Sequence, residues 1–232
     1  MQLFFAENIE SDIYTLSEEE SRHCVKVLRM GVGDTLSITD GNGTLYHCRI
    51  MEANPKGCVV DTVERLKEYG KRPFSLHVAV APTKNTARME WFVEKAVEMG
   101  VDIITPIICD HSERCSMKSE RLKKIAVSAM KQSLKAYLPL INEPTSIDRI
   151  INMPATGQRF IAYCDGEIRT PLRNAYNPGN DATILIGPEG DFSSDEVCAA
   201  LHNGFIPVTL GECRLRTETA ALAATAFFNL SN

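Results

Sequence analysis

The sequence predicts two domains of unlike architecture, a small β domain followed by a larger α/β domain. The chain has 232 residues, which is enough for one large domain or two modest ones. In its first part, short segments of alternating polarity are separated by turn residues, as in a small antiparallel barrel. After residue 73, apolar segments of strand length alternate with segments of helical spacing. This second pattern is typical of a mainly parallel sheet with helices on both faces.

The β domain is predicted to contain short strands and one helix. Its strands are expected at residues 34–40, 44–50 and 58–63. Gly41-Asn42-Gly43 is a tight-turn signal between the first two strands. Ser17 followed by Glu20 indicates the start of a helix that runs on toward Arg29. The polar segment 71–73 ends in a proline, which is typical of a domain boundary. The expected domains are therefore residues 1–72 and 73–232.

The α/β domain is predicted to alternate strands with helices. Its strands are expected at residues 75–81, 101–109, 160–164, 183–186 and 207–210. Its longer helices are expected at residues 88–99, 120–138 and 218–229. Gly100 ends the first of these helices, and Thr217 caps the last. Ser193 and Glu196 form a capping box that starts a shorter helix.

The composition is that of an ordinary globular protein, with 44% hydrophobic and 24% charged residues. No apolar run approaches the roughly 18 residues of a membrane span, and the first residues lack the basic start of a signal peptide. We therefore expect a cytoplasmic protein without a membrane partner. The eight cysteines and five histidines show neither Cys-x-x-Cys nor His-Glu-x-x-His spacing, so we expect reduced thiols and no metal site.

The charge is unevenly distributed along the chain. The net charge is −5, but residues 71–135 hold 12 Lys and Arg against 7 Asp and Glu, a balance of +5. The segments before and after this one each have a balance of −5. A basic middle segment is consistent with a phosphate-binding face and equally with a solvated helix face, so charge alone leaves a nucleic-acid partner open.

Two loops follow predicted strands of the α/β domain, at the position where such sheets bind ligands. Residues 187–192 lack a phosphate-loop pattern, and the charges of Glu189 and Asp191 disfavour phosphate. An adenosyl ligand with a positive centre suits this loop better, and a simple connection between strand and helix is the alternative. Residues 211–216 repeat the design and carry two arginines that can hold a carboxylate or a phosphate. The residues alone therefore indicate an α/β ligand-binding domain beside a small β domain.

Together the two loops resemble the signature of the RsmE-like ribosomal RNA uridine-N3 methyltransferases of the SPOUT superfamily. The similarity lies in residues 185–193, Leu-Ile-Gly-Pro-Glu-Gly-Asp-Phe-Ser, and in residues 210–220, Leu-Gly-Glu-Cys-Arg-Leu-Arg-Thr-Glu-Thr-Ala. Further matching segments are His23 with residues 27–30 and 33–34, Lys84 with residues 88–91, residues 95–101, and residues 111–114. The resemblance covers nearly the whole chain.

The resemblance implies a PUA-like β-barrel RNA-binding domain and a C-terminal SPOUT-type domain with a deep trefoil knot. The knot loops would bind S-adenosyl-L-methionine in a bent form, and two chains would pair as a homodimer to complete each site. The cofactor-binding residues implied are Leu185, Ile186, Gly187, Pro188, Glu189, Gly190, Leu210, Gly211, Leu215, Arg216, Thr217 and Thr219. The product would be N3-methyluridine in the 16S ribosomal RNA of the small ribosomal subunit.

Methylation at N3 of uracil needs help, because the nitrogen lone pair is delocalised and its proton remains at neutral pH. We expect Arg216 to stabilise charge on the flanking carbonyl oxygens or to hold a phosphate. Glu189 or Glu218 is expected to act as the acid/base, although each can equally organise its own loop. The target base must be unpaired or flipped out, since its Watson–Crick edge reacts. No metal is needed, because a sulfonium is an activated methyl donor. The predicted RNA contacts are Arg29, Lys84, Arg88 and Arg114.

Three positions depart from the family pattern. Leu3 stands where an arginine often precedes the aromatic pair, residues 132–135 read Gln-Ser-Leu-Lys in place of Gln-Ser-Gly-Arg, and Asp191 replaces the usual second glycine. Two alternative functions stay open. One is a related knotted methyltransferase that acts on a ribose 2′-hydroxyl or another base. The other is a non-catalytic RNA-binding ribosome-assembly factor, which the two intact loops argue against.

Overall fold

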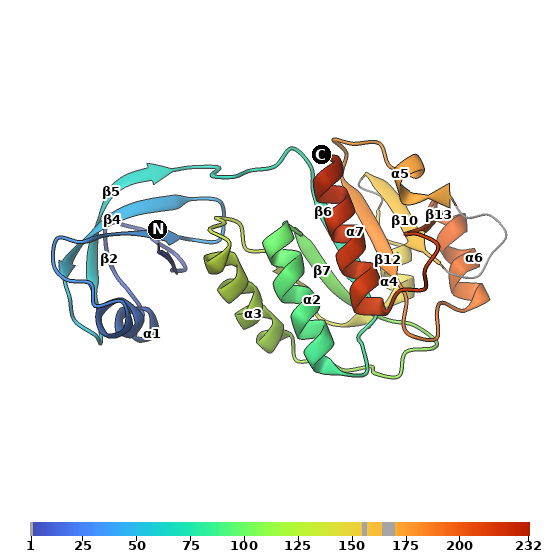
Figure 1. Cartoon of the computed structure of the whole chain (residues 1–232), viewed down its shortest axis with the longest axis horizontal. Helices are drawn as coiled ribbons and strands as arrows, with labels where there is room; N and C mark the ends of the chain where they lie inside the picture. The colour runs from blue at the N-terminus through green and yellow to red at the C-terminus, as the bar shows by residue number, and fades with distance from the viewer. Residues whose placement is uncertain (1, 155–156, 164–169) are drawn as a thin grey trace. The chain divides into compact units, whose positions relative to one another are not determined.

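The chain folds into two units, each with its own sheet (Figure 1). The structure, a computed structural model, describes residues 2–154, 157–163 and 170–232. The N-terminal unit comprises Met1–Lys71 and Val127–Leu138. The C-terminal unit comprises Arg72–Ala126 and Pro139–Asn232. The N-terminal unit is therefore made from two separate stretches of the sequence.

The N-terminal unit is built around a five-stranded sheet. Its strands are β1 (Leu3–Phe5), β2 (Ile13–Thr15), β3 (Thr35–Thr39), β4 (Leu45–Glu52) and β5 (Val59–Leu66), paired in the order β1-β3-β4-β5-β2. β3, β4 and β5 pair antiparallel, as predicted, whereas β1 joins β3 in parallel. The turn between β3 and β4 contains Gly41 and Gly43 with positive φ, as the turn signal predicts. Phe4, Ile38 and Ile50 are buried in the core of this unit.

The predicted helix near residue 18 is shorter than expected and changes type. α1 (Glu18–Arg22) begins after Ser17, whose hydroxyl accepts a hydrogen bond from the Glu20 N–H at 3.3 Å, as the sequence predicts. The next turn, η1 (His23–Val27), is a π-helix, in which the Leu28 N–H donates to the carbonyl of His23. Arg29 then adopts a positive φ of 58°. Because π-turns are rare, a helical sequence pattern predicts an ordinary α-helix here.

The C-terminal unit contains an eight-stranded sheet. Its strands are β6 (Leu76–Val80), β7 (Ile103–Ile108), β8 (Leu140–Ile141), β9 (Thr145–Ser146), β10 (Gln158–Ala162), β11 (Thr170–Pro171), β12 (Ala182–Ile186) and β13 (Ile206–Thr209). They pair in the order β11-β13-β10-β12-β6-β7-β8, and β9 adds to β7. These pairs are all parallel, which confirms the predicted mainly parallel sheet. Cys164, the end of one predicted strand, lies outside the described residues.

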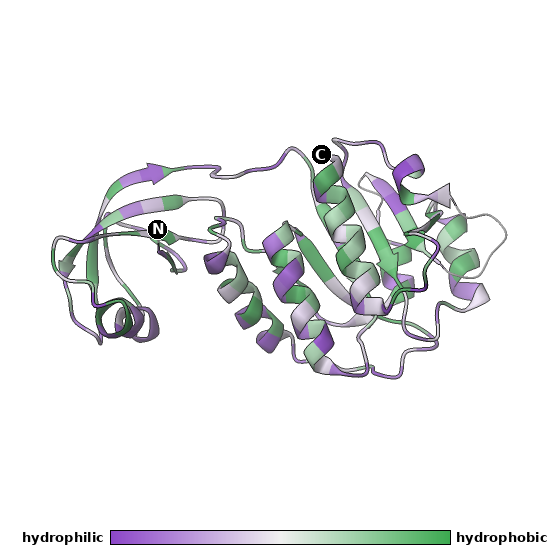
Figure 2. Ribbon diagram, viewed as in Figure 1, coloured by the Kyte–Doolittle hydropathy of each residue, from purple (hydrophilic) through white to green (hydrophobic). Residues whose placement is uncertain are grey.

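Helices cover both faces of this parallel sheet. The helices of this unit are α2 (Thr86–Met99), α4 (Ile147–Ile151), α5 (Leu172–Ala175), α6 (Ser194–His202) and α7 (Thr217–Ser231). α3 (Ser119–Gln132) begins in this unit and ends within the second stretch of the N-terminal unit. α2 and α7 lie side by side along one face (Figure 1), and α4 and α6 pack with Leu185 and Ile161 on the other. Figure 2 shows the strands between these layers as largely hydrophobic, as expected for a sheet buried on both sides. Among the described residues, no helix is long and apolar enough to cross a membrane.

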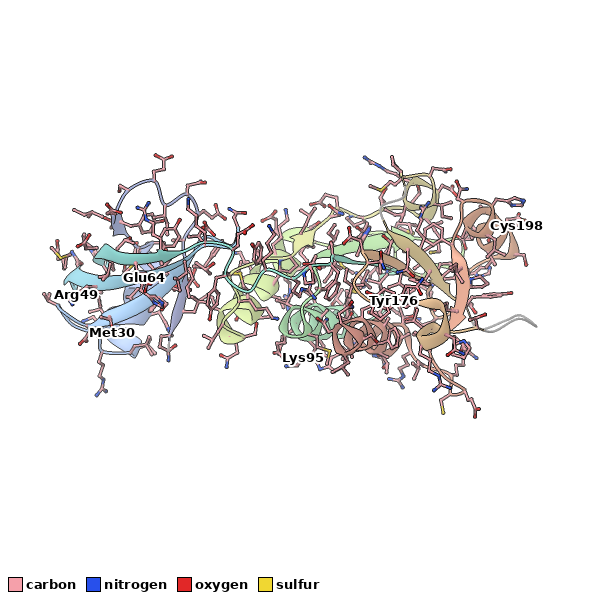
Figure 3. The ribbon with its side chains drawn as sticks, turned by 90° about the horizontal axis from the view of Figure 1, so that it is seen from above. Met30, Arg49, Glu64, Lys95, Tyr176 and Cys198 are labelled. Atoms are coloured by element: carbon pink, nitrogen blue, oxygen red, sulfur yellow. The ribbon has the colours of Figure 1, made fainter. Side chains whose placement is uncertain are left out.

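An aromatic cluster holds α7 on the sheet. The ring of Phe228 lies 5.9 Å from that of Phe160 in β10 and 4.8 Å from that of Tyr176, which is labelled in Figure 3. The Tyr176 hydroxyl donates to the carbonyl of Asn180 at 3.0 Å. Aromatic pairs at these distances stabilise a fold beyond the burial of their surface. The C-terminal half of α7 is therefore fixed, which gives its first turn a defined position at the other end.

The predicted ends of two helices differ from the structure. α3 ends at Gln132 and not at residue 138, because Leu134 adopts the left-handed conformation with φ 56° and breaks the helix. α7 begins at Thr217 with Arg216 as its N-cap, so the prediction that Thr217 caps this helix is wrong. The Thr217 hydroxyl donates elsewhere, to the carbonyl of Gly187 at 3.0 Å.

The predicted end of α2 and the predicted start of α6 are confirmed. Gly100 ends α2 with φ 101°, a conformation that glycine adopts without strain. At α6, the Ser193 hydroxyl accepts from the Glu196 N–H, and the Glu196 carboxylate accepts from the Ser193 N–H. Local sequence signals thus set these two boundaries.

The cysteines in the described residues are free thiols. Cys24, Cys48, Cys58 and Cys109 are buried, and Cys115, Cys198 and Cys213 are exposed. Burial raises the pKa of the Cys24 thiol to about 12, so this side chain behaves as a small hydrophobe. Cys198 lies at the surface on α6 (Figure 3). The described residues contain no cluster of three or more His, Cys, Asp and Glu side chains suited to a metal.

Candidate functional site

A cavity lies at the carboxyl ends of three neighbouring strands in the C-terminal unit. β10 pairs in parallel with β12 on one side and with β13 on the other, so the carboxyl ends of all three meet at one edge of the sheet. The cavity has a volume of about 790 Å³. Its lining comes from residues 162–163 at the end of β10, residues 186–191 at and beyond the end of β12, residues 208–217 at and beyond the end of β13, and Ala220 in α7. The two loops that stand out in the sequence therefore form most of its wall.

The loop after β12 turns tightly before α6 begins. The Asp191 N–H donates to the carbonyl of Pro188 at 3.0 Å, and Asp191 adopts a positive φ of 61°. The Phe192 ring packs so closely over Gly187 that a Cβ atom at this glycine would lie 3.1 Å from the ring. A side chain at Gly187 would therefore crowd the Phe192 ring, and the φ of Gly187 is not positive. The capping box of α6 at Ser193 then fixes the end of the loop.

A hydrogen bond connects the end of the loop after β13 to the first loop. At the start of the loop after β13, the Thr209 hydroxyl donates to the carbonyl of Gly211 at 2.7 Å, and Gly211 has φ 145°. The loop ends at Thr217, whose hydroxyl donates to the carbonyl of Gly187 at 3.0 Å. Thr217 is buried, so this bond is shielded from water. The first turn of α7 therefore holds the two cavity loops together.

The lining of the cavity combines apolar walls with charges of both signs. The apolar side chains are Ile186, Val208, Leu210 and Leu215, and the charged ones are Glu189, Asp191, Glu212, Arg214 and Arg216. Apolar walls suit a flat ring, carboxylates attract a positive centre, and arginines bind a carboxylate through paired N–H groups. These residues fit the adenosyl ligand with a positive centre that the sequence predicts.

The structure brings most of the predicted cofactor-binding residues together. Those that line the cavity are Ile186, Gly187, Pro188, Glu189, Gly190, Leu210, Gly211, Leu215, Arg216 and Thr217. Leu185 and Thr219 lie outside the lining: Leu185 is fully buried between the sheet and the α4–α6 layer, and Thr219 is exposed on α7. The cofactor roles of all twelve residues stay predictions.

The two predicted acid/base residues have different surroundings. Glu189 lines the cavity and is exposed, and its Oε1 accepts from the Lys84 N–H at 3.4 Å. Glu218 lies outside the lining and is buried, with only 8% of its side chain exposed. Its Oε1 is 3.6 Å from Arg88 Nε, and its Oε2 has no hydrogen-bond partner among the described residues. Only Glu189 therefore faces the cavity.

Three of the four predicted RNA-contact residues lie around the start of α2. Lys84 Nζ is 2.8 Å from Glu113 Oε2, and Arg114 Nη2 donates to the carbonyl of Lys84 at 3.2 Å. The hydrogen bond that Lys84 donates to the Glu113 carboxylate raises the pKa of Lys84, so this ammonium stays charged at neutral pH. Arg88 is the third of these residues, and it forms an ion pair with Glu218. Arg29 belongs to the N-terminal unit, where it is exposed after η1.

Several residues of the cavity were not among the predicted site residues. The end of β10 contributes Ala162, the next residue along the chain is Tyr163, and α7 contributes Ala220. The signal for the first two was present, because a strand was predicted at residues 160–164 and ligands bind beyond the carboxyl ends of such strands. The sequence does not show which strands are neighbours in the sheet, because the pairing of β10 between β12 and β13 depends on tertiary structure.

The fold and the cavity define a class of protein, in which a parallel-sheet domain with a ligand cavity at its carboxyl edge is joined to a small β domain. The RNA methyltransferase domain family matches residues 70–229, and the RNA methyltransferase PUA domain family matches residues 16–63. The chain therefore belongs to the RNA methyltransferase family. The resemblance read from the two loops is thereby confirmed.

Individual relatives match over almost the whole chain. The Ribosomal RNA small subunit methyltransferase E of Buchnera aphidicola is 30% identical, with 93% of this chain and 89% of the relative covered. The crystal structure of a probable rRNA-methyltransferase from Porphyromonas gingivalis has a TM-score of 0.93 at 45% identity, covering 99% of this chain and 98% of that one. The Ribosomal RNA small subunit methyltransferase E of Neisseria gonorrhoeae, crystallised bound to S-adenosyl methionine, has a TM-score of 0.87 at 26% identity, covering 99% and 97%.

Proposed function

We propose that this protein transfers a methyl group from S-adenosyl-L-methionine to N3 of a uridine in the 16S ribosomal RNA of the small ribosomal subunit. The observation that carries the proposal is the cavity at the carboxyl ends of β10, β12 and β13, walled by the two loops of the family signature. Support also comes from relatives that are named small subunit methyltransferases and from the Neisseria structure bound to S-adenosyl methionine. When bound, the sulfonium supplies an activated methyl group, so the reaction requires no metal.

Glu189 is our choice for the group that accepts the N3 proton. It is exposed and lines the cavity, whereas Glu218 is buried beside Arg88 and lies outside the lining. As the N3–methyl bond forms and the methyl–sulfur bond breaks, the N3 proton passes to the Glu189 carboxylate and S-adenosylhomocysteine is released. Arg216, on the opposite loop, donates to a uracil carbonyl oxygen, where negative charge develops as the proton leaves.

RNA binding is assigned to both domains. Lys84, Arg88 and Arg114 surround the start of α2 and are the proposed phosphate contacts of the methyltransferase domain, residues 73–232. In this arrangement, Glu218 positions the Arg88 guanidinium. Arg29 is the proposed contact of the PUA-like domain, residues 1–72.

Three further features belong to the proposal. The segment that leads from β13 to α7 is proposed to thread a trefoil knot, in keeping with the bond from Thr217 to the loop after β12. A homodimer is proposed because α2 exposes 44% of Trp91, and aromatic residues are enriched at subunit interfaces. The cytoplasm is the proposed location, because ribosomal RNA is modified there in bacteria. A crystal structure tests the knot, and sedimentation of the purified chain tests the dimer.

Methyl transfer from labelled S-adenosyl-L-methionine to small ribosomal subunits is the test of the proposed reaction. The subunits come from a strain that lacks this gene, and the labelled nucleosides are separated and identified by mass spectrometry. Label recovered as N3-methyluridine supports the proposal. Label in a 2′-O-methylated nucleoside overturns the target and favours a related methyltransferase. Absence of both label and cofactor binding favours the non-catalytic assembly factor.

The proposed proton acceptor is tested in the same assay. Glu189→Gln keeps the size of the side chain but removes the base, and general-base catalysis contributes typically about 100-fold or more to the rate. We therefore expect kcat to fall by about 100-fold or more. Glu10→Gln, an exposed change in the N-terminal unit, serves as the control. A rate for Glu189→Gln equal to that of the control would exclude Glu189 as the base.

A further inference from the structure

The segment that follows β7 makes direct hydrogen bonds to the cavity loop after β12. His111 Nδ1 lies 3.1 Å from the carbonyl oxygen of Gly190 and 3.0 Å from that of Asp191. Both partners are acceptors, so Nδ1 carries the proton and donates to them. β7 is not a neighbour of β12, because β6 lies between them in the sheet. A residue from a more distant strand therefore reaches the loop that forms one wall of the cavity.

The contact between His111 and the loop is close as well as polar. A Cβ atom at Gly190 would lie 3.0 Å from the Cβ atom of His111, which is tighter than ordinary van der Waals contact. The φ of Gly190 is not positive, so the need for glycine at this position comes from space. A side chain at the second glycine of the Gly-Pro-Glu-Gly motif would therefore crowd His111.

The turn that carries His111 is itself held in place. The Ser112 hydroxyl accepts from the Cys109 N–H at 2.9 Å and closes the turn. Next to His111, the Asp110 N–H donates to Glu196 Oε1 at 2.9 Å, and the Ser193 hydroxyl donates to Asp110 Oδ2 at 2.6 Å. These bonds connect the turn to the capping box of α6. His111 therefore approaches the loop from a fixed support.

The part of the loop that His111 contacts includes a residue with an unfavourable backbone conformation. Asp191 adopts φ 61°, in the left-handed region that costs a residue with a side chain roughly 1 kcal/mol. Gly190 and Asp191 line the cavity, whereas His111 does not. Their carbonyl groups are the acceptors for the Nδ1–H of His111. Two hydrogen bonds from one ring nitrogen hold both peptide groups in this orientation.

We propose that His111 is a positioning residue that sets the conformation of cavity residues 187–191 by donating its Nδ1–H to the carbonyls of Gly190 and Asp191. This inference rests on the proposed function for its effect on S-adenosyl-L-methionine. His111 acts through the loop and makes no contact with the ligand. Without its donor, the peptide groups at Gly190 and Asp191 reorient, and the loop samples shapes that bind the cofactor less tightly.

Two substitutions at this position separate the hydrogen bond from the packing. His111→Phe keeps a ring but has no donor. His111→Asn has no ring, but its Nδ2 is bonded to Cγ as Nδ1 is in histidine, so a donor stays at the same distance from Cβ. His202→Phe is the matched control, because His202 Nδ1 also bonds a backbone carbonyl, that of Cys198 at 2.9 Å, within its own helix α6.

The full-length variants are compared by amide hydrogen exchange of residues 187–193 and by steady-state methyl transfer. Loss of hydrogen bonds worth about 1 kcal/mol predicts a rise in the KM for S-adenosyl-L-methionine of about 3- to 10-fold in His111→Phe. We expect kcat to change little and exchange to become faster in the loop. His111→Asn is expected to restore both measurements to within about twofold of the unsubstituted protein.

The inference is overturned if His111→Phe behaves like His202→Phe in both measurements. It is equally overturned if His111→Asn is as impaired as His111→Phe, since packing of the ring would then be the decisive contact. If the unsubstituted protein transfers no methyl group, the proposed function fails. The exchange of residues 187–193 still decides the role of His111 in that case, because it is measured without cofactor.

Discussion

Arg159 is a buried cation whose partners are backbone carbonyls and an aromatic ring. Its guanidinium donates to the carbonyls of Ile150 and Ile151 at 3.0 and 2.8 Å and to that of Asn203 at 3.1 Å. It also stacks over the ring of Phe205, 4.0 Å from the centroid. The carbonyls belong to the ends of α4 and α6, where helices leave acceptors unpaired and favour positive charge. The Arg159 side chain in β10 therefore supplies hydrogen-bond donors to the carboxyl ends of both helices.

Replacement of this arginine is expected to destabilise the C-terminal unit strongly. Arg159→Met fills much of the same volume but leaves three carbonyls without their donor, so we expect the free energy of unfolding to fall by roughly 3 kcal/mol. Urea unfolding followed by circular dichroism measures this change. Arg173→Met, an exposed change on α5, is the control and should stay within about 0.5 kcal/mol. Equal stability of the two variants would contradict this account.

Arg216 is expected to need its guanidinium shape as well as its charge. It lines the cavity at the N-cap of α7, where paired N–H groups can bind a carbonyl oxygen or a phosphate. We expect Arg216→Gln to lower kcat by about 100-fold, the loss typical for one donor to a developing oxyanion. Arg216→Lys should be intermediate, because it keeps the charge alone. Steady-state kinetics on small ribosomal subunits measures both, and an unchanged kcat in Arg216→Gln would remove Arg216 from the reaction.

Among the elements, α6 is preceded by a residue, Ser193, that both caps the helix and forms a tertiary contact. Ser193 caps α6 through the N–H of Glu196, and its hydroxyl also donates to Asp110 Oδ2 from the turn after β7. The Glu196 carboxylate is shared in the same way between the Ser193 N–H and the Asp110 N–H. The start of this helix is therefore also the joint between the turn after β7 and the cavity loop.

Loss of this cap should affect stability and the cavity loop together. Ser193→Ala removes the N-cap acceptor and the bond to Asp110, so we expect a loss of about 1 to 2 kcal/mol in the free energy of unfolding. Ser194→Ala, the exposed neighbour at the first helical position, should cost less than about 0.5 kcal/mol. Chemical denaturation compares the two. Similar losses would mean that the cap contributes little to this helix.

Elements with a strong local signal could be predicted from the sequence, and elements decided by tertiary contacts could not. The end of α2 at Gly100 and the start of α6 at Ser193 follow from residues within a few positions. The π-turn of η1 and the early end of α3 at Leu134 have no such signal. For the site, the two loops were evident from their motifs. The hydrogen bonds from His111 to the loop after β12 were not evident. They depend on how the turn after β7 packs against a loop from a strand that is not its neighbour in the sheet.

For the molecule as a whole, stability in acid depends on a histidine inside the parallel sheet. His77 in β6 is half-buried, and its Nε2 lies 2.7 Å from the Thr105 hydroxyl, which accepts from Asn142 Nδ2 at 2.8 Å. The Thr105 hydroxyl can therefore donate its own proton to a neutral His77. Burial lowers the pKa of His77 from 6.5 to about 4. The folded protein thus keeps this imidazole neutral where the unfolded chain binds a proton.

The free energy of unfolding should consequently fall as the pH is lowered from 6.5 toward 4. Above pH 6.5, both states carry neutral His77. Between the two pKa values, only the unfolded state is protonated, which favours unfolding by up to about 3 kcal/mol near pH 4. His77→Gln should flatten this dependence, and His202→Gln should not. Urea titrations between pH 4 and 7.5 measure the slopes, and equal slopes for all three proteins would contradict the assignment.

The N-terminal unit is expected to require residues 127–138. The carbonyl of Ala136 accepts from the Thr39 hydroxyl at 3.1 Å and from the Gly43 N–H at 2.9 Å, and Lys131 forms an ion pair with Glu20. A fragment of residues 1–71 lacks these partners and should unfold at a lower temperature, with a broader transition, than one in which residues 127–138 are joined to it by a Gly/Ser linker. Thermal unfolding followed by circular dichroism compares them. Identical transitions would show that the second stretch is dispensable.

The division of the N-terminal unit between two stretches of sequence has a consequence for how this protein can evolve. Recombination moves contiguous pieces of a gene. A crossover near codon 72 would bring in a foreign β domain without the stretch Val127–Leu138 that completes it. Hybrids between distant relatives should therefore be recovered rarely with a single junction, and more often when residues 127–138 are inherited from the same parent as the first 71.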